Sequence, residues 1–233
     1  MSEIINIFPL SVYKSKITLK NQDKEKMIKE ILSMRDKSLK DSSILKKKSN
    51  SWTGDVSGFD QLHNDSNFFN LFKKIQENIK KYCENLFIDH EQIDFYFQRS
   101  WATVSLGPEN IAAHKHDQSH LSFAYYLKKN EKDSKIYFLD SSNQNEFIPR
   151  LFSSESINKK NIIKKRNFQN SPRVNINIEE DDIVIFPSKT LHATETNINN
   201  DERISISADI ICIAKESSYL ENLTPPLNNW KKF

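Results

Sequence analysis

The stretch from residue 111 to 127 reads Ile-Ala-Ala-His-Lys-His-Asp-Gln-Ser-His-Leu-Ser-Phe-Ala-Tyr-Tyr-Leu and holds three of the six histidines of this 233-residue chain. His114 and His116 are two positions apart, so on an extended strand both imidazoles point to the same face. A distant histidine, His192, follows a hydrophobic run, and Arg203 lies in a later alternating segment. Together these residues predict a metal site with an anion-binding side chain beside it, on a β scaffold.

The rest of the chain predicts helices first and strands afterwards. Residues 22–40 and 67–87 carry apolar side chains at helical spacing, and Ser66 is expected to cap the second helix. An opening strand or bent pair of strands is expected within residues 4–19. Further strands are predicted at 93–105, 119–127, 135–140, 173–178, 182–187 and 202–213. This order, without βαβ alternation, favours an α+β, mainly β fold with a barrel or sandwich core.

We expect one domain over residues 1–233, because no linker or internal repeat divides the chain. Its expected parts are a mostly helical N-terminal part (1–90), a β core (91–213) and an irregular tail (214–233). Residues 141–172 are polar and lack periodicity, which is typical of a long insertion between strands. This insertion and the 42–60 loop are expected to shape the entrance of the site.

The composition of the chain argues against two kinds of partner, nucleic acids and membranes. The net charge is only +3 and the lysine runs are short, which argues against a nucleic-acid partner. No segment approaches a membrane span, and the N-terminus lacks a signal-peptide pattern. Cys83 and Cys212 lie far apart and are expected to be free, buried thiols. We therefore expect a cytoplasmic protein with neither a membrane nor a nucleic-acid partner.

Three blocks of the sequence resemble one enzyme family. His-Lys-His-Asp-Gln-Ser-His-Leu-Ser-Phe-Ala-Tyr-Tyr-Leu (114–127) is similar to the His-x-His-Pro-x-Ser-x-Leu-Ser-Gly-x-Tyr-Tyr-Leu signature of a 2-oxoglutarate (2OG) and iron(II)-dependent oxygenase family of marine bacteria and phages. Asp-Asp-Ile-Val-Ile-Phe-Pro-Ser-Lys-Thr-Leu-His (181–192) and Glu-Arg-Ile-Ser-Ile-Ser (202–207) resemble two later blocks of that family in the same order. Asn6-Ile-Phe-Pro and Ser100-Trp101 also match in place. The resemblance implies a double-stranded β-helix (jelly roll) with the N-terminal helices packed outside.

The resemblance also implies a set of site residues. Iron(II) would be held by His114, His116 and His192, and the co-substrate 2OG by Arg203 and Ser205. No catalytic side chain beyond the metal ligands is implied. The expected activity is that of a dioxygenase, which uses O₂ and 2OG to hydroxylate a substrate.

The third metal ligand has an alternative. The common two-His, one-carboxylate set places Asp or Glu where His116 stands, and Asp117 could take that role if a bulge turned it inward. Because the family signature also has His at this position, we favour the three-His set. His120 is adjacent and could support the ligands, whereas His63 and His90 are expected to have no role in the site.

Several nearby residues could line the pocket or belong to the core, namely Trp101, Thr103, Tyr125 and Tyr126. Phe123 replaces a glycine of the signature and is expected to fill space near the site. Two other functions remain open: a jelly-roll metal enzyme that does not use 2OG (a three-His dioxygenase or isomerase), and a non-catalytic jelly-roll binding module. The substrate is equally open, with a protein side chain, a nucleobase and a small metabolite all compatible.

Overall fold

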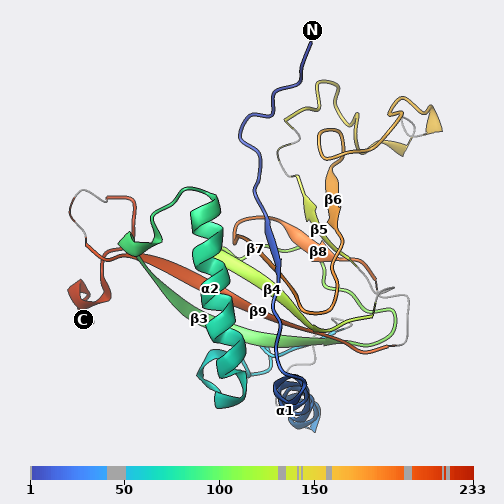
Figure 1. Ribbon diagram of the computed structural model, residues 1–233. Helices are drawn as coiled ribbons and strands as arrows, with labels where there is room; N and C mark the ends of the chain where they lie inside the picture. The colour runs from blue at the N-terminus through green and yellow to red at the C-terminus, as the bar shows by residue number, and fades with distance from the viewer. Residues whose placement is uncertain are drawn as a thin grey trace.

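A computed structural model describes residues 2–40, 51–130, 135–140, 142, 144–155, 159–196, 201–216, 218 and 221–233. Two α-helices, α1 (Asn21–Lys40) and α2 (Phe69–Asn85), precede most of the strands (Figure 1). Four short 3-10 helices accompany them: η1 (Leu62–Asn64), η2 (Ser66–Phe68), η3 (His90–Gln92) and η4 (Leu227–Asn229).

The strands form two antiparallel sheets. The larger sheet has the order β1-β7-β4-β9-β3-β2, with β1 (Tyr13–Lys16), β2 (Trp52–Thr53), β3 (Ile93–Ser105), β4 (Leu121–Lys128), β7 (Asp182–Pro187) and β9 (Arg203–Ala214). The smaller sheet has the order β6-β5-β8, with β5 (Ile136–Leu139), β6 (Arg173–Ile176) and β8 (His192–Thr194). The mainly β architecture expected from the sequence is confirmed, with both helices packed on the outside of the larger sheet (Figure 1).

The side chains of strand β9 alternate between the two faces of the larger sheet. Ile204, Ile206, Ala208 and Ile210 pack in the core that the sheet shares with the helices. Side chains alternate along a strand, so Arg203, Ser205, Ser207 and Asp209 point to the opposite face, between the two sheets. That inner face is therefore unusually polar for the centre of a sheet.

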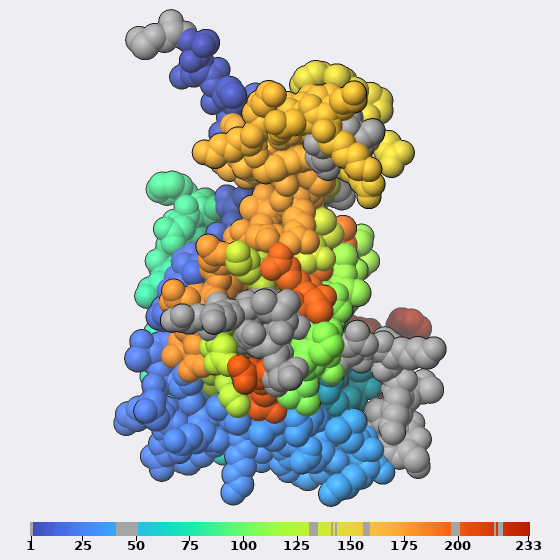
Figure 2. Space-filling view, turned by 90° about the vertical axis from the view of Figure 1, so that its right-hand side faces the viewer, coloured from blue at the N-terminus to red at the C-terminus, as the bar shows by residue number. Residues whose placement is uncertain are grey.

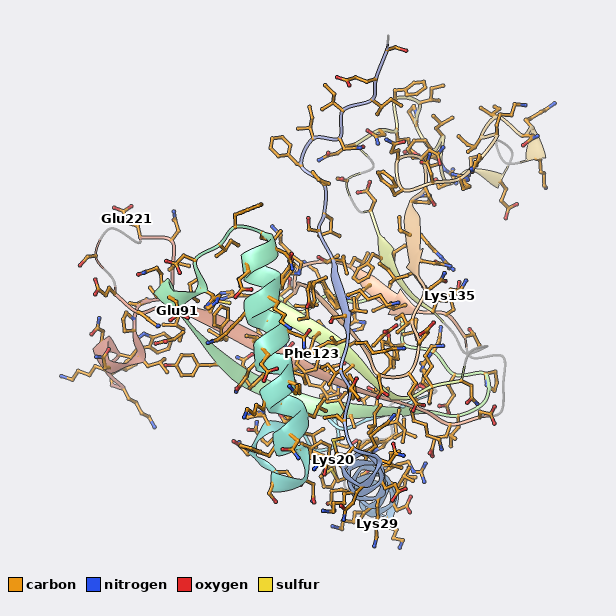
Figure 3. The ribbon with its side chains drawn as sticks, viewed as in Figure 1. Lys20, Lys29, Glu91, Phe123, Lys135 and Glu221 are labelled. Carbon is orange, nitrogen blue, oxygen red and sulfur yellow. The ribbon has the colours of Figure 1, made fainter. Side chains whose placement is uncertain are left out.

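The outer core fills the space between α2 and the sheet. Ile75 of α2 is 0 % exposed, and Phe72 meets Phe123 of β4 with ring centroids 6.5 Å apart. Phe123 lies under α2 (Figure 3). The expectation that Phe123 fills space near the site is therefore wrong, because the strand alternation turns it to the helix side.

The stability of this outer core leads to a prediction. Ile75→Ala is expected to lower the free energy of unfolding by about 2–5 kcal/mol, because it removes a fully buried side chain and leaves a cavity. Phe69→Ala on the same helix is the control: Phe69 is 67 % exposed, so a change within about 0.5 kcal/mol is expected. Urea denaturation measures both values, and equal losses would contradict the packing described here.

A smaller core joins the two sheets. Its buried members come from β4, β5 and β7 and from the turn before β7: Tyr126, Ile136, Phe138, Ile178, Val184 and Phe186. Phe186 and Phe138 also reach His192, with ring centroids 4.7 Å and 6.2 Å away. This apolar cluster forms one wall beside the histidines.

Several local expectations differ from the structure. Of residues 4–19, only β1 forms a strand. Ser66 does not cap α2: the helix begins after η2, where Asp65 accepts a hydrogen bond from the backbone N–H of Asn67. The described part of the 141–172 insertion projects from the body as a lobe next to the N-terminal arm (Figure 2). Residues 42–50 of the expected 42–60 loop lie outside the described residues.

Two expectations from composition concern cysteines and membranes. Cys83 and Cys212 are both free; Cys83 is buried and Cys212 is half-buried. None of the helices in the described part of the chain combines the length and the apolar character needed to cross a membrane.

Candidate metal centre

Three histidines from two distant segments meet between the sheets. One ring nitrogen from each of His114, His116 and His192 lies within 4.8 Å of the other two. Backbone pairing brings the segments together: His114 and His192 exchange two N–H···O hydrogen bonds of 3.0 Å, and the N–H of His116 donates to the carbonyl of Ser188. Residues 111–114 thus extend the smaller sheet beyond β8, as an isolated bridge rather than as the regular strand expected from the sequence.

The hydrogen bonds of the three rings determine which nitrogen is available to a metal. Nδ1 of His114 lies 2.8 Å from the carbonyl of Ala112, and Nδ1 of His192 lies 2.8 Å from the carbonyl of Thr190. Nδ1 of His116 lies 2.8 Å from Oδ1 of Asp209. Carbonyl and carboxylate oxygens only accept, so each Nδ1 carries the proton and each neutral ring keeps a lone pair on Nε2.

Burial keeps two of the rings neutral. Burial and, to a smaller extent, the neighbouring His114 together lower the pKa of His192 to about 3, against the opposing effect of its hydrogen bond to Thr190. Burial also lowers the pKa of His114, against the opposing effect of its hydrogen bond to Ala112. Neutral imidazoles are the form that binds a metal, so His114 and His192 are suited to bind a divalent cation such as iron(II).

Asp209 lies within the histidine site, and the sequence reasoning missed it. Its side chain is 0 % exposed and accepts hydrogen bonds from His116 on Oδ1 and from Arg99 and Gln118 on Oδ2. Burial alone would raise the pKa of Asp209, but the bonds from His116 and Arg99 outweigh it and hold that pKa at about 2. The available signal was the alternation of β9, which places Asp209 on the same face as Arg203.

Two residues considered as parts of the site lie outside it. Asp117 has a side chain 73 % exposed and pairs with Lys115 at 2.8 Å, so it lies in solvent and not in the cluster. His120 is exposed, and its Nδ1 accepts the backbone N–H of Cys212 instead of supporting a ligand. The supporting position expected for His120 is occupied by Asp209.

Trp101 and Thr103 lie on the inner face, since they pair in register with Ser207 and Ser205. The Trp101 ring stacks on His116 at 5.7 Å between centroids. Gly54 packs behind Trp101, where there is no room for a side chain. A Cβ added to Gly54 would lie 2.6 Å from the carbonyl oxygen of Phe59. The described part of the 42–60 loop therefore supports the site through Trp101.

Arg203 lies deeper on the inner face and spans both sheets. It is 2 % exposed, and its Nη2 donates to Ser105 Oγ at 3.0 Å and lies 3.5 Å from Thr194 Oγ1 on β8. Ser205 is half-buried and pairs in register with both Thr103 and Tyr126. A buried guanidinium surrounded by hydroxyl groups is well suited to a carboxylate.

The two tyrosines considered as pocket residues have opposite orientations. Tyr125 belongs to the outer core, where its hydroxyl donates to Asp181. Tyr126 faces inward and is 2 % exposed; burial raises its pKa to about 12, while the positive charge of Arg203 acts in the other direction. Tyr126 therefore lies on the same face of the sheet as Arg203, whose charge acts on it.

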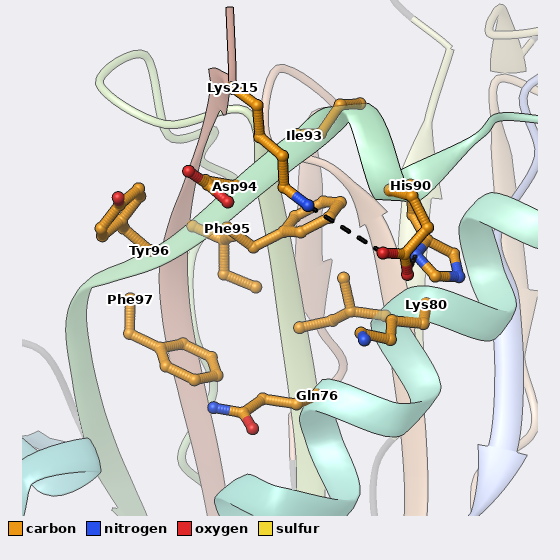
Figure 4. A pocket seen from close by; sticks show the side chains of 12 residues that line it. Gln76, Lys80, His90, Ile93, Asp94, Phe95, Tyr96, Phe97 and Lys215 are labelled. Atoms are coloured by element: carbon orange, nitrogen blue, oxygen red, sulfur yellow. Dashed lines mark ion pairs between the residues drawn. The ribbon is translucent and has the colours of Figure 1, made fainter. Parts of the chain in front are cut away.

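A separate pocket of about 230 Å³ opens between α2 and the start of β3, on the helix side of the larger sheet (Figure 4). Phe95 and Phe97 line it, and His90 and Lys215 both pair with Glu91 at its rim. It is distinct from the histidine cluster because the sheet lies between them.

Comparison with known proteins agrees with this geometry. Residues 99–209 match the family described as "Putative 2OG-Fe(II) oxygenase". The resemblance expected from the sequence is thereby confirmed over a segment that contains the three histidines, Arg203 and Ser205. Members of this oxygenase family use iron(II) and 2OG. No curated protein matches the chain by sequence.

Several solved structures share the fold of this chain. SnoK, a non-heme alpha-ketoglutarate-dependent carbocyclase from nogalamycin biosynthesis, aligns with a TM-score of 0.57 at 11 % identity, covering 93 % of this chain and 87 % of SnoK. A prolyl-4-hydroxylase from Pseudomonas putida aligns with a TM-score of 0.52 at 9 % identity, covering 87 % of this chain and 92 % of that enzyme. AviO1 from Streptomyces viridochromogenes aligns with a TM-score of 0.52 at 11 % identity, covering 93 % of this chain and 92 % of AviO1. These likenesses confirm the double-stranded β-helix fold.

Proposed function

We propose that this oxygenase-family protein hydroxylates a C–H bond of its substrate, with iron(II) held by His114, His116 and His192. The observation that carries the proposal is the convergence of three histidines whose Nε2 atoms are all left free by hydrogen bonds to Nδ1. Three nitrogen donors would leave other positions of the metal open for co-substrate and O₂. Iron(II), when bound, supplies the activation of O₂ that accompanies decarboxylation of 2OG to succinate.

The co-substrate is proposed to bind along the inner face of β9. Arg203 would pair with the distal carboxylate of 2OG, and the hydroxyls of Ser205 and Tyr126 would donate to the same group. The burial of Arg203 strengthens such a pairing, because the local dielectric is low. The apolar wall formed by Phe138 and Phe186 would keep water away from the metal side of the cavity.

Anaerobic titration tests this function directly. Iron(II) and 2OG added together are expected to give a weak visible charge-transfer band that neither gives alone, and admission of O₂ should then release succinate. Zinc(II) in place of iron(II) is the control, and it should give no band.

The competing functions have different outcomes. Metal binding without a 2OG-dependent band or succinate would favour a three-His enzyme that does not use 2OG. Absence of iron(II) binding would favour a non-catalytic binding module and overturn the proposal.

A further inference from the structure

The hydrogen bond between His116 and Asp209 distinguishes one ligand from the other two. His114 and His192 each direct Nδ1–H to a neutral backbone carbonyl two residues earlier in the chain. His116 instead directs Nδ1–H, at 2.8 Å, to a carboxylate on a different strand. The difference falls at the position where the common two-His, one-carboxylate set has its acidic ligand.

Asp209 is held in place from its other side. Oδ2 accepts from Arg99 Nη2 at 2.6 Å, from Arg99 Nε at 3.2 Å and from Gln118 Nε2 at 2.8 Å. With these three N–H groups on Oδ2, Oδ1 is left to receive the Nδ1–H of His116, with the Ser119 hydroxyl 3.3 Å away. The orientation of the carboxylate is thus determined by several donors together.

A bulge in β3 makes this arrangement possible. The register of β3 against β9 shifts between Phe97 and Arg99, so that Phe97 pairs with Ile210 and Arg99 with Asp209. Phe97 packs in the outer core, and without the extra residue Arg99 would share that face. The bulge turns Arg99 to the inner face, where it reaches Asp209.

The His116 ring is restrained on its faces as well as at its edge. Trp101 stacks on it at 5.7 Å with 29° between planes, and His192 stacks at 5.4 Å with 10°. Arg99 in turn lies over the Trp101 ring at 5.3 Å. The ring can therefore neither turn over nor exchange its two nitrogens without breaking several contacts.

We propose that Asp209 is a positioning residue, which fixes the tautomer of His116 so that Nε2 can bind the metal, and which raises the basicity of that nitrogen. The Asp209 carboxylate would thus act on the metal through His116 instead of binding the metal itself. The inference rests on the proposed function, since it assigns a role toward the same metal. Partners of this kind set the tautomer of a ligand histidine, and their loss weakens metal binding by about 10- to 100-fold.

Asp209→Asn tests the proposal by a specific competition. The asparagine side chain has one oxygen, and the three N–H groups of Arg99 and Gln118 would donate hydrogen bonds to it. The amide NH₂ would then face His116, whose Nδ1 must accept and whose proton moves to Nε2. Metal-free protein, analysed by two-bond ¹H–¹⁵N correlation spectra, should show His116 protonated on Nδ1 in the wild type and on Nε2 in the variant.

Cobalt(II) titration, without 2OG or substrate, supplies the second measurement. Asp209→Asn is expected to weaken cobalt(II) binding by about 10- to 100-fold. Arg99→Gln is the matched variant: it removes the ion pair but keeps the carboxylate on His116, so binding within about threefold of wild type and an unchanged tautomer are expected. Asp182→Asn removes another buried carboxylate, which pairs with Lys14, and should have no effect on cobalt(II).

The outcomes separate this inference from the proposed function. Equal losses of cobalt(II) affinity in Asp209→Asn and Arg99→Gln would make Asp209 a structural ion-pair partner and overturn the proposal. An unchanged His116 tautomer in Asp209→Asn would also overturn it. A wild type that binds no cobalt(II) would count against the metal site itself, and the metal-free spectra would still decide whether Asp209 sets the tautomer.

If Asp209→Asn does not fold, the double variant Asp209→Ala/Arg99→Gln takes its place, because it removes both charges of the pair together with the oxygen that accepts from His116. It is expected to show the same loss of cobalt(II) affinity, and wild-type affinity would overturn the proposal.

Discussion

His116→Ala is expected to lower iron(II) affinity by more than about 100-fold, whereas Asp117→Ala should leave it within about twofold of wild type. The reason is geometric: the ring of His116 belongs to the cluster, while the Asp117 carboxylate lies in solvent and pairs with Lys115. Removal of one of three ligands leaves two nitrogens, which cannot hold the cation on three sides. Competition with a chromophoric chelator under anaerobic conditions measures both affinities.

His120→Ala controls for a general effect of histidine loss in this segment. The His120 side chain is exposed and its Nδ1 accepts the backbone N–H of Cys212, away from the cluster, so the affinity should not change. Loss of iron(II) binding in Asp117→Ala, with His116→Ala unaffected, would reverse the ligand assignment and favour a two-His, one-carboxylate site.

Arg203→Ala is expected to weaken 2OG binding by at least about 30-fold, corresponding to about 2–5 kcal/mol for loss of one partner of a buried charge pair. Iron(II) binding should persist, because Arg203 is not among the clustered nitrogens. Titration of 2OG into the iron(II)-loaded protein, followed by the visible band, measures the change.

Two further variants test whether the effect on 2OG binding is specific to Arg203 and its neighbours. Arg173→Ala removes an arginine of the smaller sheet that stacks on Tyr137 and pairs with Glu195, and 2OG binding should be unaffected. Tyr126→Phe removes only the inward hydroxyl, so a weakening of roughly 3- to 10-fold is expected for one hydrogen bond. Normal 2OG affinity in Arg203→Ala would refute the proposed co-substrate site and favour a metal enzyme of this fold that does not use 2OG.

The choice between His116 and Asp117 shows how much of the ligand set the sequence spacing alone can predict. The i, i+2 relation of His114 and His116 predicts a shared face, and the structure brings these rings together. Adjacent residues in an extended segment point in opposite directions, which favours His116 over Asp117, but a bulge would reverse that choice. Such a bulge depends on how the neighbouring segment pairs, and here residues 188–192 hold the backbone in its observed register.

The sequence by itself determined both α-helices and most of the strands, but not β2 or β8; it also determined that the fold is mainly β and which four residues could form a metal and anion site. These follow from side-chain periodicity and from motif spacing, which are local properties. Only the tertiary structure decided that Phe123 faces the helices, that Asp117 lies in solvent, and that Asp209 reaches His116. The physical reason is that strand register and the β3 bulge, between Phe97 and Arg99, set which side chains meet across strands, and both depend on pairing between residues far apart in the sequence, such as Arg99 with Asp209 and Phe123 with Ala208.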